Sequence, residues 1–346
     1  MAEQTLLEVN NLKVYFPIRN GFRGRTSGHV KAVDDVSFTI QRGETLGLVG
    51  ESGSGKTTLG RSILRAIDPT SGTINFAFAD DAGQIDISTI RESELRAYRQ
   101  YMQMIFQDPY SSLNPRMTVR DIIAEPLVAM GLASGNVLEE RIRETAQRCR
   151  LNLEHLRRFP HAFSGGQRQR IGIARALVSN PQFIVCDESV SALDVSIQAD
   201  ILNLLMDLQE ELGLTYLFIA HDLSVVAHIS TRVAVMYVGQ LVELAPTRKL
   251  FYGPKHPYTE ALLSAIPDID PDKRLDQNHL IGEIPNPADP PSGCRFHTRC
   301  PYVEDRCKVE APRWQQIDDD HFVACHFATE LDLQGIKSQE VTTQVF

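Results

Sequence analysis

A glycine-rich segment early in this chain has side chains suited to binding phosphate. It reads Gly50-Glu51-Ser52-Gly53-Ser54-Gly55-Lys56-Thr57 and fits the pattern G-x-x-x-x-G-K-[ST]. Its glycines let the backbone wrap a phosphate chain, Lys56 reaches the β- and γ-phosphate oxygens, and Thr57 supplies a hydroxyl for Mg²⁺. An apolar run precedes the segment and a predicted helix follows it, which is the context this pattern requires. We therefore predict a nucleoside-triphosphate loop from Gly50 to Thr58.

A second glycine-rich segment, Ser164-Gly165-Gly166-Gln167, lies far downstream. It opens an amphipathic stretch that ends at Leu177, so its backbone N–H groups would lie at a helix N-terminus, where anions bind. One chain thus has two phosphate-seeking helix ends but one nucleotide pocket. This is explained if two chains close face to face, each offering its second loop to the nucleotide held by the other.

Two acids follow an apolar run in Cys186-Asp187-Glu188. Open α/β sheets place their ligand sites at such strand ends. We expect Asp187 to hold Mg²⁺, usually through water, and Glu188 to face the γ-phosphate and polarise the attacking water. The alternative is a paired acidic loop without chemistry.

Together these segments resemble the ATP-binding-cassette (ABC) family, and the resemblance implies further roles. Gln107 is similar to the family's glutamine that contacts Mg²⁺ or water and senses the membrane partner, and His221 to the histidine that contacts the γ-phosphate. Asp194 matches the cross-subunit contact. Phe16 falls where the family stacks an aromatic ring on adenine, with Tyr15 as the alternative, and either could instead be a core residue.

Longer motifs resemble the oligopeptide/dipeptide import branch, closest to its dipeptide-type second ATPase subunit. They run over residues 105–116, 191–196 and 221–226, with His256-Pro257-Tyr258-Thr259 and Pro290-Pro291-Ser292-Gly293-Cys294 marking the branch's C-terminal extension. One departure is Ser189, where the branch usually has proline. The branch also imports nickel, glutathione and opines, so these solutes stay open alternatives to peptides.

Other functional classes fit the sequence less well than an importer. A soluble ATPase acting on ribosomes or DNA usually has two cassettes per chain or long coiled-coil inserts, and neither is present. An iron–sulfur-regulated ATPase would change activity steeply on loss of its cluster. An exporter is disfavoured by the absence of spanning segments and by the import-branch motifs.

Four cysteines, Cys294, Cys300, Cys307 and Cys325, crowd the C-terminal region. No C-x₂-C pair is present, which weakens a zinc-ribbon interpretation. Four thiolates suit Zn²⁺ or a [4Fe–4S] cluster. The resemblance implies [4Fe–4S], with Zn²⁺ and four free cysteines as alternatives.

Composition sets further limits. The 346 residues carry a net charge of −9, which argues against general nucleic-acid binding. No apolar run approaches the roughly 18 residues of a membrane span, and no secretory signal is seen at the start of the sequence. We expect a peripheral protein on the cytoplasmic face of the inner membrane. The resemblance implies as partners a second, different ATPase subunit, two permease subunits and an extracytoplasmic solute-binding protein.

The elements that must position these residues predict an α/β fold. Apolar runs at 104–106, 183–186 and 216–220 indicate buried parallel strands, and residues 6–49 read as short strands forming an antiparallel flank. The basic segment Arg19–Lys31 reads as a hairpin loop, and Lys56–Ile67 as a helix. We expect an ABC domain over 1–252, with a helical subdomain at about 111–168. A small cysteine-containing C-terminal domain at 253–330 and a loose tail at 331–346 would follow.

Overall fold

The computed structural model describes residues 4–20, 25–78, 83–266 and 282–336. Backbone contacts group the chain into two compact units. The first unit comprises residues 1–7, 39–44 and 75–219, and the second comprises 8–38, 45–74 and 220–346, each as far as it is described.

Three parallel strands form the sheet of the first unit. They are β6 (Met102–Ile105), β7 (Phe183–Asp187) and β8 (Thr215–Ile219), in the order β8-β7-β6. Val185 of β7 is paired with Leu217 on one side and Met104 on the other. Every residue of β7 and β8 is buried, which explains their continuous apolar character. The three predicted strands are confirmed, each within two residues of its predicted ends.

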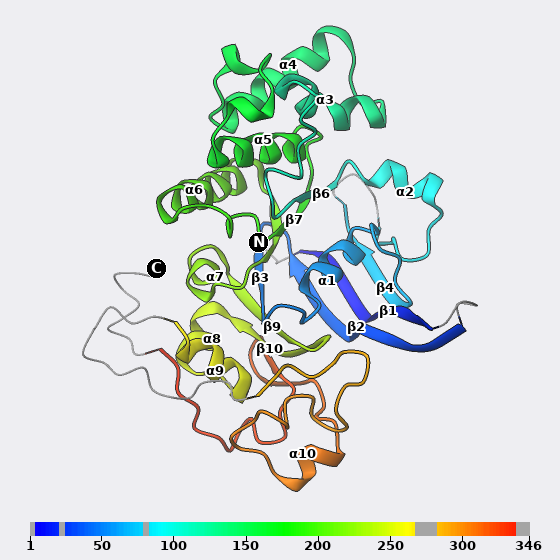
Figure 1. Ribbon diagram of the computed structural model, residues 1–346, viewed down its shortest axis with the longest axis vertical. Coiled ribbons are helices and arrows are strands. Elements are labelled where there is room, and N and C mark those ends of the chain that lie inside the picture. Colours follow the sequence, from blue (N-terminus) through cyan, green and yellow to red (C-terminus); the bar gives the residue numbers. More distant parts are fainter. Residues whose placement is uncertain (1–3, 21–24, 79–82, 267–281, 337–346) are drawn as a thin grey trace. The chain divides into compact units, whose positions relative to one another are not determined.

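Helices make up most of the rest of the first unit. They are α2 (Glu92–Tyr98), α3 (Val119–Met130), α4 (Gly135–Arg148), α5 (Gly165–Leu177) and α6 (Val195–Leu212), with single turns η1 (Leu153–His155) and η2 (Pro160–Ala162). Figure 1 shows α3, α4 and α5 grouped together, and α5 packs against α3, α4 and α6. A short strand, β5 (Ile85–Asp86), pairs with the end of β4. The predicted helical region is therefore present.

Five strands of one sheet lie in the second unit, in the order β11-β12-β10-β9-β3. They are β3 (Thr45–Val49), β9 (Arg232–Tyr237), β10 (Gln240–Pro246), β11 (Gln315–Asp318) and β12 (His321–Val323). β3 runs parallel to β9, whereas the other pairings are antiparallel. Helix α1 (Lys56–Ile63) follows β3 in the chain. Helix α7 (Leu223–Ile229) packs against β3.

A second sheet lies largely in the second unit and contains β1 (Thr5–Asn20), β2 (Arg25–Gln41) and β4 (Ser71–Phe76), in the order β2-β1-β4. The interpretation of Arg19–Lys31 as a loop was wrong over most of its length, because β2 already begins at Arg25. Backbone hydrogen bonds extend a two-stranded ribbon beyond the residues whose side chains pack in the core. The polar side chains of this segment therefore did not indicate that its backbone is in strands. Helix α1 is also shorter than predicted, since Arg65 has a left-handed backbone (φ 52°).

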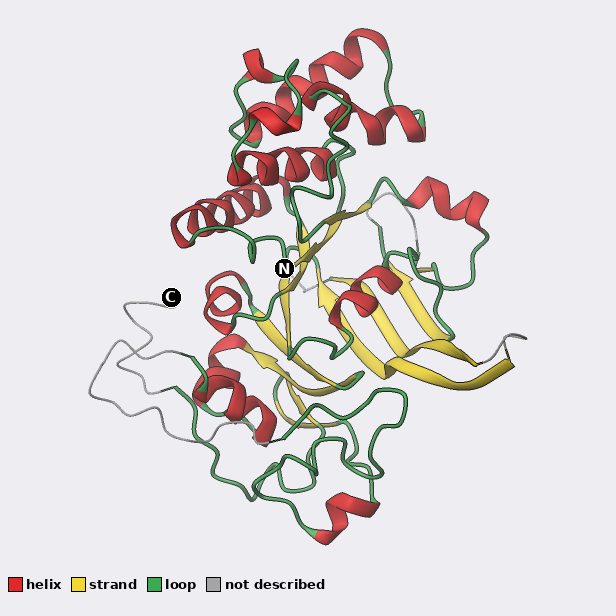
Figure 2. Cartoon of the chain, in the orientation of Figure 1, coloured by secondary structure: helices red, strands yellow, loops and turns green. Residues whose placement is uncertain are grey.

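The C-terminal part of the second unit has few regular elements. It contains α8 (Thr247–Tyr252), α9 (Pro257–Ser264) and α10 (Asp305–Val309), and Figure 2 shows mostly loops over residues 282–336. The second unit continues through residue 252 without a break. The predicted domain boundaries therefore stay predictions.

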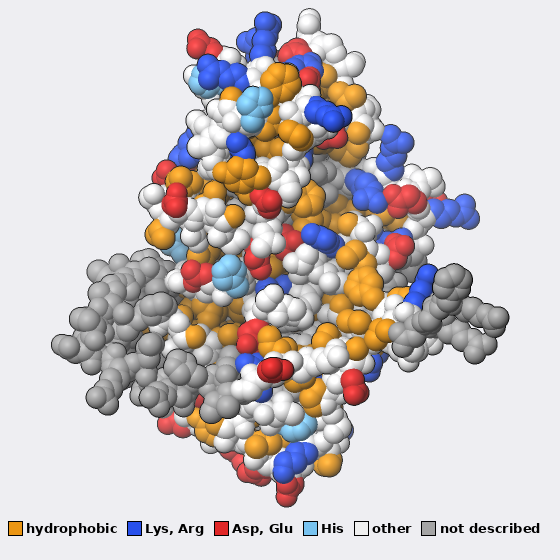
Figure 3. Space-filling view, in the orientation of Figure 1, with side chains coloured by type: hydrophobic (Ala, Val, Ile, Leu, Met, Phe, Trp, Pro, Cys, Tyr) orange, Lys and Arg blue, Asp and Glu red, His pale blue; other side chains and the backbone are white. Residues whose placement is uncertain are grey.

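Helices of the described residues include none long and apolar enough to cross a membrane. On the visible face of the first unit's helical part, acidic and basic side chains are interspersed (Figure 3). This mixed surface does not present one large field of a single charge.

Candidate functional site

The glycine-rich loop at residues 50–57 lies in the second unit, between β3 and α1. Lys56 is 5% exposed, and its Nζ donates to the carbonyl oxygens of Gly50 at 2.7 Å and Glu51 at 3.0 Å. The helix N-cap, Gly55, provides no side-chain cap, and the first turn has no acidic residue. This leaves the positive end of the helix suited to an anion.

Two glycines of this loop have no room for a side chain. A Cβ on Gly50 would lie 2.1 Å from the carbonyl oxygen of Met236, and one on Gly55 would lie 2.1 Å from that of Ala32. Both also have positive φ, of 150° and 108°. The loop therefore rests directly on the backbone of β9 and β2, which fixes its path.

Of the two aromatic candidates, Phe16 and Tyr15, Phe16 has the exposed ring. Phe16 is 40% exposed on β1. Tyr15 is half-buried, and its hydroxyl donates to Asp34, which also forms an ion pair with Arg295. Burial and the Asp34 carboxylate raise the pKa of Tyr15. Phe16 thus has a ring surface available for stacking, whereas Tyr15 is held by its hydroxyl.

Asp187, Glu188 and Gln107 lie in the first unit, at the carboxyl ends of β7 and β6. Asp187 is buried, whereas Glu188 is half-buried and Gln107 exposed. Gln107 Nε2 donates to Glu188 Oε2 at 2.7 Å. Two residues far apart in the sequence are thus brought together at the carboxyl ends of neighbouring strands.

Glu188 has a left-handed backbone, with φ 46°. Its N–H donates to the Ile219 carbonyl at 2.9 Å, and its own carbonyl accepts from the Ser191 hydroxyl at 2.9 Å. Contacts on both sides hold it in a sparsely populated conformation of the kind that clusters at functional sites.

His221 belongs to the second unit, is exposed, and lies two residues after the end of β8. The next residue, Asp222, is the N-cap of α7 and accepts from Ser224 N–H at 2.9 Å. The helix start fixes the backbone beside the histidine.

The second glycine-rich segment begins α5, as predicted. Ser164 is the N-cap, with its hydroxyl accepting from Gln167 N–H at 3.4 Å, while Gln167 Oε1 accepts from Ser164 N–H at 3.0 Å. A Cβ on Gly166 would lie 2.4 Å from the Ile197 side chain. Asp194 is the exposed N-cap of α6. Since the first turn of α5 carries no acid, its amides are suited to bind an anion.

Two arginines connect α5 to the segment after Gln107. Arg168 lies over the Tyr110 ring at 4.2 Å from its centre, and Arg175 donates to the Ser112 carbonyl at 2.6 Å. Arg175 also lies 5.4 Å from the Phe106 ring. These contacts could not be predicted from the sequence, because arginines in an amphipathic helix are typical of a solvent-facing surface.

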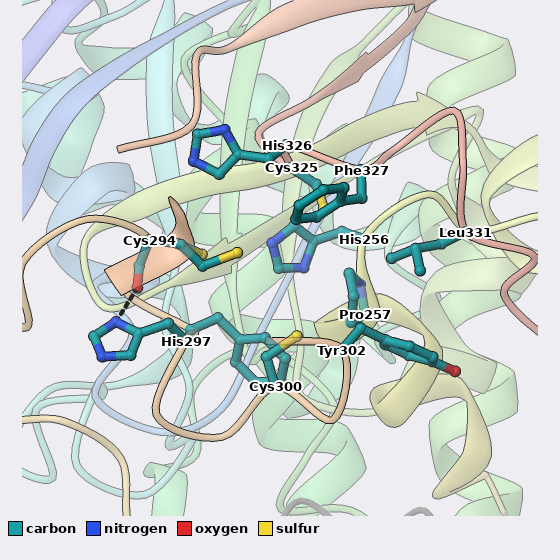
Figure 4. Close-up of a pocket in the computed structure, with 12 residues that line it drawn as sticks. His256, Pro257, Cys294, His297, Cys300, Tyr302, Cys325, His326, Phe327 and Leu331 are labelled. Atoms are coloured by element: carbon teal, nitrogen blue, oxygen red, sulfur yellow. Dashed lines mark hydrogen bonds between the residues drawn. The ribbon is translucent and has the colours of Figure 1, made fainter. Parts of the chain in front are cut away.

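The four C-terminal cysteines lie around one cavity of about 20 Å³. Figure 4 shows the sulfur atoms of Cys294, Cys300 and Cys325 directed toward this space, with His256 beside them, and Cys307 also lines it. Burial raises the pKa of Cys300 to about 12 and that of Cys325 to about 11.

Within the described residues, no three His, Cys, Asp or Glu side chains lie close enough together to hold one metal ion. A zinc ion with Zn–S bonds of about 2.3 Å needs its sulfurs within roughly 4 Å of one another. The arrangement therefore does not fit a single zinc ion. Four cysteine thiols lining one cavity are the type of donor that iron–sulfur clusters use.

Tyr258 and Arg299 contact the glycine-rich loop and were not singled out from the sequence for that role. Glu51 N–H donates to the Tyr258 hydroxyl at 2.8 Å, and Arg299 forms an ion pair with the Glu51 carboxylate at 2.6 Å. The only signal in the sequence was Glu51, an acidic residue inside a loop predicted to bind phosphate. An acid there indicates that a cation should neutralise it, but does not indicate which residue supplies that cation.

Two family models match the chain. The model described as ABC transporter matches residues 33–191, and the model described as oligopeptide/dipeptide transporter, C-terminal region, matches residues 242–307.

Curated relatives match almost the whole chain. An oligopeptide transport ATP-binding protein, AppF, of Bacillus subtilis is 51% identical over 327 residues, covering 94% of this chain and 98% of the relative. A probable peptide ABC transporter ATP-binding protein, y4tS, of Sinorhizobium fredii is 52% identical over 321 residues, covering 93% and 89%. A putative peptide import ATP-binding protein of Brucella ovis is 51% identical, covering 94% and 98%.

Solved structures match the fold. A dimeric post-hydrolysis state of the ATP-binding cassette MJ0796, bound to ADP and Pi, has a TM-score of 0.60 at 28% identity, covering 70% of this chain and 99% of that one. The structure of cbiO1 from Clostridium perfringens, part of the transporter complex cbiONQ, has a TM-score of 0.59 at 26% identity, covering 72% and 91%.

Proposed function

Because this chain belongs to the ABC transporter family of ATPases, we propose that it is the ATP-hydrolysing subunit of an importer for di- or oligopeptides. The observation that carries the proposal is the match to relatives named for peptide transport over 93–94% of the chain. That match includes the oligopeptide/dipeptide C-terminal region at 242–307, so it is not confined to the cassette common to all such transporters.

Each residue near the nucleotide has a distinct role in this proposal. The loop Gly50–Thr58 binds the phosphates, with Lys56 on the β- and γ-oxygens, and Phe16 stacks on adenine. The exposed ring of Phe16 supports its assignment over Tyr15. His221 contacts the γ-phosphate.

Glu188 accepts a hydrogen bond from the water whose oxygen attacks the γ-phosphorus, and ADP leaves as the bond to the bridging oxygen breaks. The Gln107 bond to Glu188 supports this role, because it orients the carboxylate. Thr57, Gln107 and Asp187 would hold Mg²⁺, which when bound neutralises phosphate charge. A buried carboxylate at the end of β7 is suited to that ion.

The second loop serves a different nucleotide in this proposal. Ser164, Gly165, Gly166 and Gln167, with Asp194, act on ATP bound by a second cassette subunit, which we propose to be a different chain. The capped but acid-free start of α5 supports this role. A dimeric cassette among the solved relatives is consistent with such pairing.

We further propose that Cys294, Cys300, Cys307 and Cys325 hold a [4Fe–4S] cluster as a structural staple. The support is the common cavity lined by all four cysteines in a part of the chain with few helices and strands. Such a cluster would supply cross-links between loops rather than chemistry at the nucleotide.

The remaining proposal concerns partners and location. ATPases of peptide importers work with membrane permeases, and we propose two permease chains, a second ATPase subunit and an extracytoplasmic binding protein. The chain would then sit on the cytoplasmic face of the membrane.

A pull-down tests this assembly. The tagged chain is recovered from detergent-solubilised membranes and every co-purifying chain is identified by mass. We expect two multi-spanning permeases and a second cassette subunit. Recovery of ribosomal or DNA-associated proteins in their place would contradict the importer function while leaving ATP hydrolysis possible.

A further inference from the structure

Glu51, inside the phosphate loop, is held through its N–H, its carbonyl and its carboxylate. The N–H donates to Tyr258, the carbonyl accepts from Lys56, and the carboxylate pairs with Arg299. From this we infer that Arg299 and Tyr258, which come from the C-terminal part of the chain, are positioning residues that set the phosphate loop for nucleotide through Glu51. The inference rests on the proposed binding of ATP by this loop.

The pair between Arg299 and Glu51 is two-pronged. Nη1 donates to Oε2 at 2.6 Å and Nη2 donates to Oε1 at 3.1 Å. The Arg299 side chain is 3% exposed and that of Glu51 is 24% exposed. A guanidinium that meets a carboxylate with two parallel bonds in a buried place fixes orientation as well as distance.

Tyr258 holds the backbone of the same residue. Its hydroxyl accepts from Glu51 N–H at 2.8 Å, and its side chain is fully buried on α9. Its ring lies 4.6 Å from that of Tyr237 and 5.4 Å from that of Phe296, measured between centres. An aromatic cluster that cannot move without losing packing therefore fixes this hydroxyl.

Arg299 is anchored by the same cluster. Nη1 lies 3.4 Å from the Tyr237 hydroxyl, and the neighbouring Phe296 packs edge-on to Tyr237. Cys300 follows in sequence and lines the cysteine cavity together with Phe296. The segment that presents the guanidinium is thus supported from both sides.

Charge gives Arg299 a second effect. A carboxylate within a loop that receives a triphosphate repels the ligand unless a cation neutralises it. Arg299 supplies that cation from outside the loop, so Lys56 need not be neutralised by Glu51. Removing the charge of Arg299 alone should therefore weaken nucleotide binding more than removing the charges of both Arg299 and Glu51.

The test compares Arg299→Gln, Glu51→Gln and the double variant in the full chain, with MgADP affinity measured by calorimetry and ATPase kcat and KM by phosphate release. We expect Arg299→Gln to weaken MgADP and raise KM about tenfold, with kcat within about threefold of the wild type. The double variant should return to within about threefold of wild-type affinity, since the unpaired carboxylate is gone.

Arg306→Gln is the matched control. Arg306 also pairs with a glutamate of the C-terminal part, Glu310, but both side chains are about half exposed. We expect its MgADP affinity to equal that of the wild type. Tyr258→Phe is a second variant, which removes one oxygen without changing the charge. It should lower the affinity for MgADP severalfold, and it keeps the inference testable even if Arg299→Gln folds poorly.

Three results overturn the inference. The first is that Arg299→Gln binds MgADP as tightly as Arg306→Gln does. The second is that the losses of MgADP affinity in the two single variants add strictly in the double variant. The third is that Tyr258→Phe binds MgADP with wild-type affinity. Failure of the wild-type chain to bind MgADP would instead contradict the proposed function itself, so the two failures are distinguishable.

Discussion

At the scale of single residues, the side chain proposed to orient the attacking water belongs to a glutamate held in an uncommon conformation. Glu188 has a positive φ and is tied to Gln107, to the Ile219 carbonyl and to Ser191. A left-handed backbone in a non-glycine residue costs of the order of 1 kcal/mol and persists where its surroundings determine it. The position of this carboxylate is therefore set before a nucleotide arrives.

Replacing Glu188 by glutamine should separate binding from turnover. The Glu188→Gln change removes the charge proposed to polarise water but retains a side-chain oxygen that can accept from Gln107. We expect MgADP affinity within about threefold of the wild type and kcat lowered at least about a hundredfold. Calorimetry and phosphate release measure the two quantities. Near-normal hydrolysis would remove Glu188 from the assigned role.

Residue types and spacing predicted the candidate chemistry because each motif is local. Lys56, Asp187 and Glu188 were found from a few neighbouring letters and the strand before them. Arg299 and Tyr258 were not, because they reach Glu51 from more than 200 positions away. A contact of that kind is set by packing of the aromatic cluster, which no local pattern encodes.

At the scale of elements, α5 joins the second glycine-rich loop to the segment after Gln107. Its N-terminus carries Ser164 and Gln167, and its Arg175 holds the Ser112 carbonyl. Element existence was predicted well for β7, β8 and α6, whose apolar patterns are strong. The extent of the β1–β2 ribbon was mispredicted, because its outer part is held by backbone hydrogen bonds and requires no particular pattern of side chains.

Two glycines of α5 provide a matched pair for testing this helix. A Cβ at Gly172 meets nothing within 4 Å, whereas one at Gly166 meets Ile197 at 2.4 Å. We expect Gly172→Ala to raise the free energy of unfolding by about 0.5–1 kcal/mol through helix propensity. Gly166→Ala should lower it by about 1–3 kcal/mol through overpacking. Urea unfolding measures both, and equal effects at the two positions would refute this account of the helix start.

At the scale of the whole molecule, the C-terminal part is built into the second unit. Glu243 on β10 is fully buried and accepts from Lys255 N–H, His256 N–H and His321 Nε2 at 2.7, 3.1 and 2.8 Å. β12 is paired with β10, and Arg295 with Asp34. The boundary predicted near residue 252 stays a prediction, and the family model for the C-terminal region begins at residue 242.

The buried His256 should make the fold sensitive to acid. Burial lowers its pKa to about 3, and Nδ1 accepts from Tyr258 N–H at 3.0 Å, so it cannot take a proton without losing that bond. The unfolded chain binds this proton near pH 6.5, so stability is full above that pH and falls as the pH drops toward 3.

This effect amounts to about 2 kcal/mol between pH 7 and pH 5. His256→Asn keeps an acceptor for Tyr258 N–H but does not titrate. Urea unfolding measures the free energy of unfolding at both pH values. Between pH 7 and pH 5 this free energy should fall by about 2 kcal/mol less in the variant than in the wild type. Equal losses would mean that His256 does not control the pH dependence.

The central claim is that hydrolysis by this chain drives peptide import. The most direct test measures uptake of a labelled dipeptide into cells that lack the chain and receive either the wild type or Glu188→Gln at equal abundance. We predict that the wild type restores uptake and Glu188→Gln does not. Uptake supported equally by Glu188→Gln, or by cells without the chain, would contradict the claim.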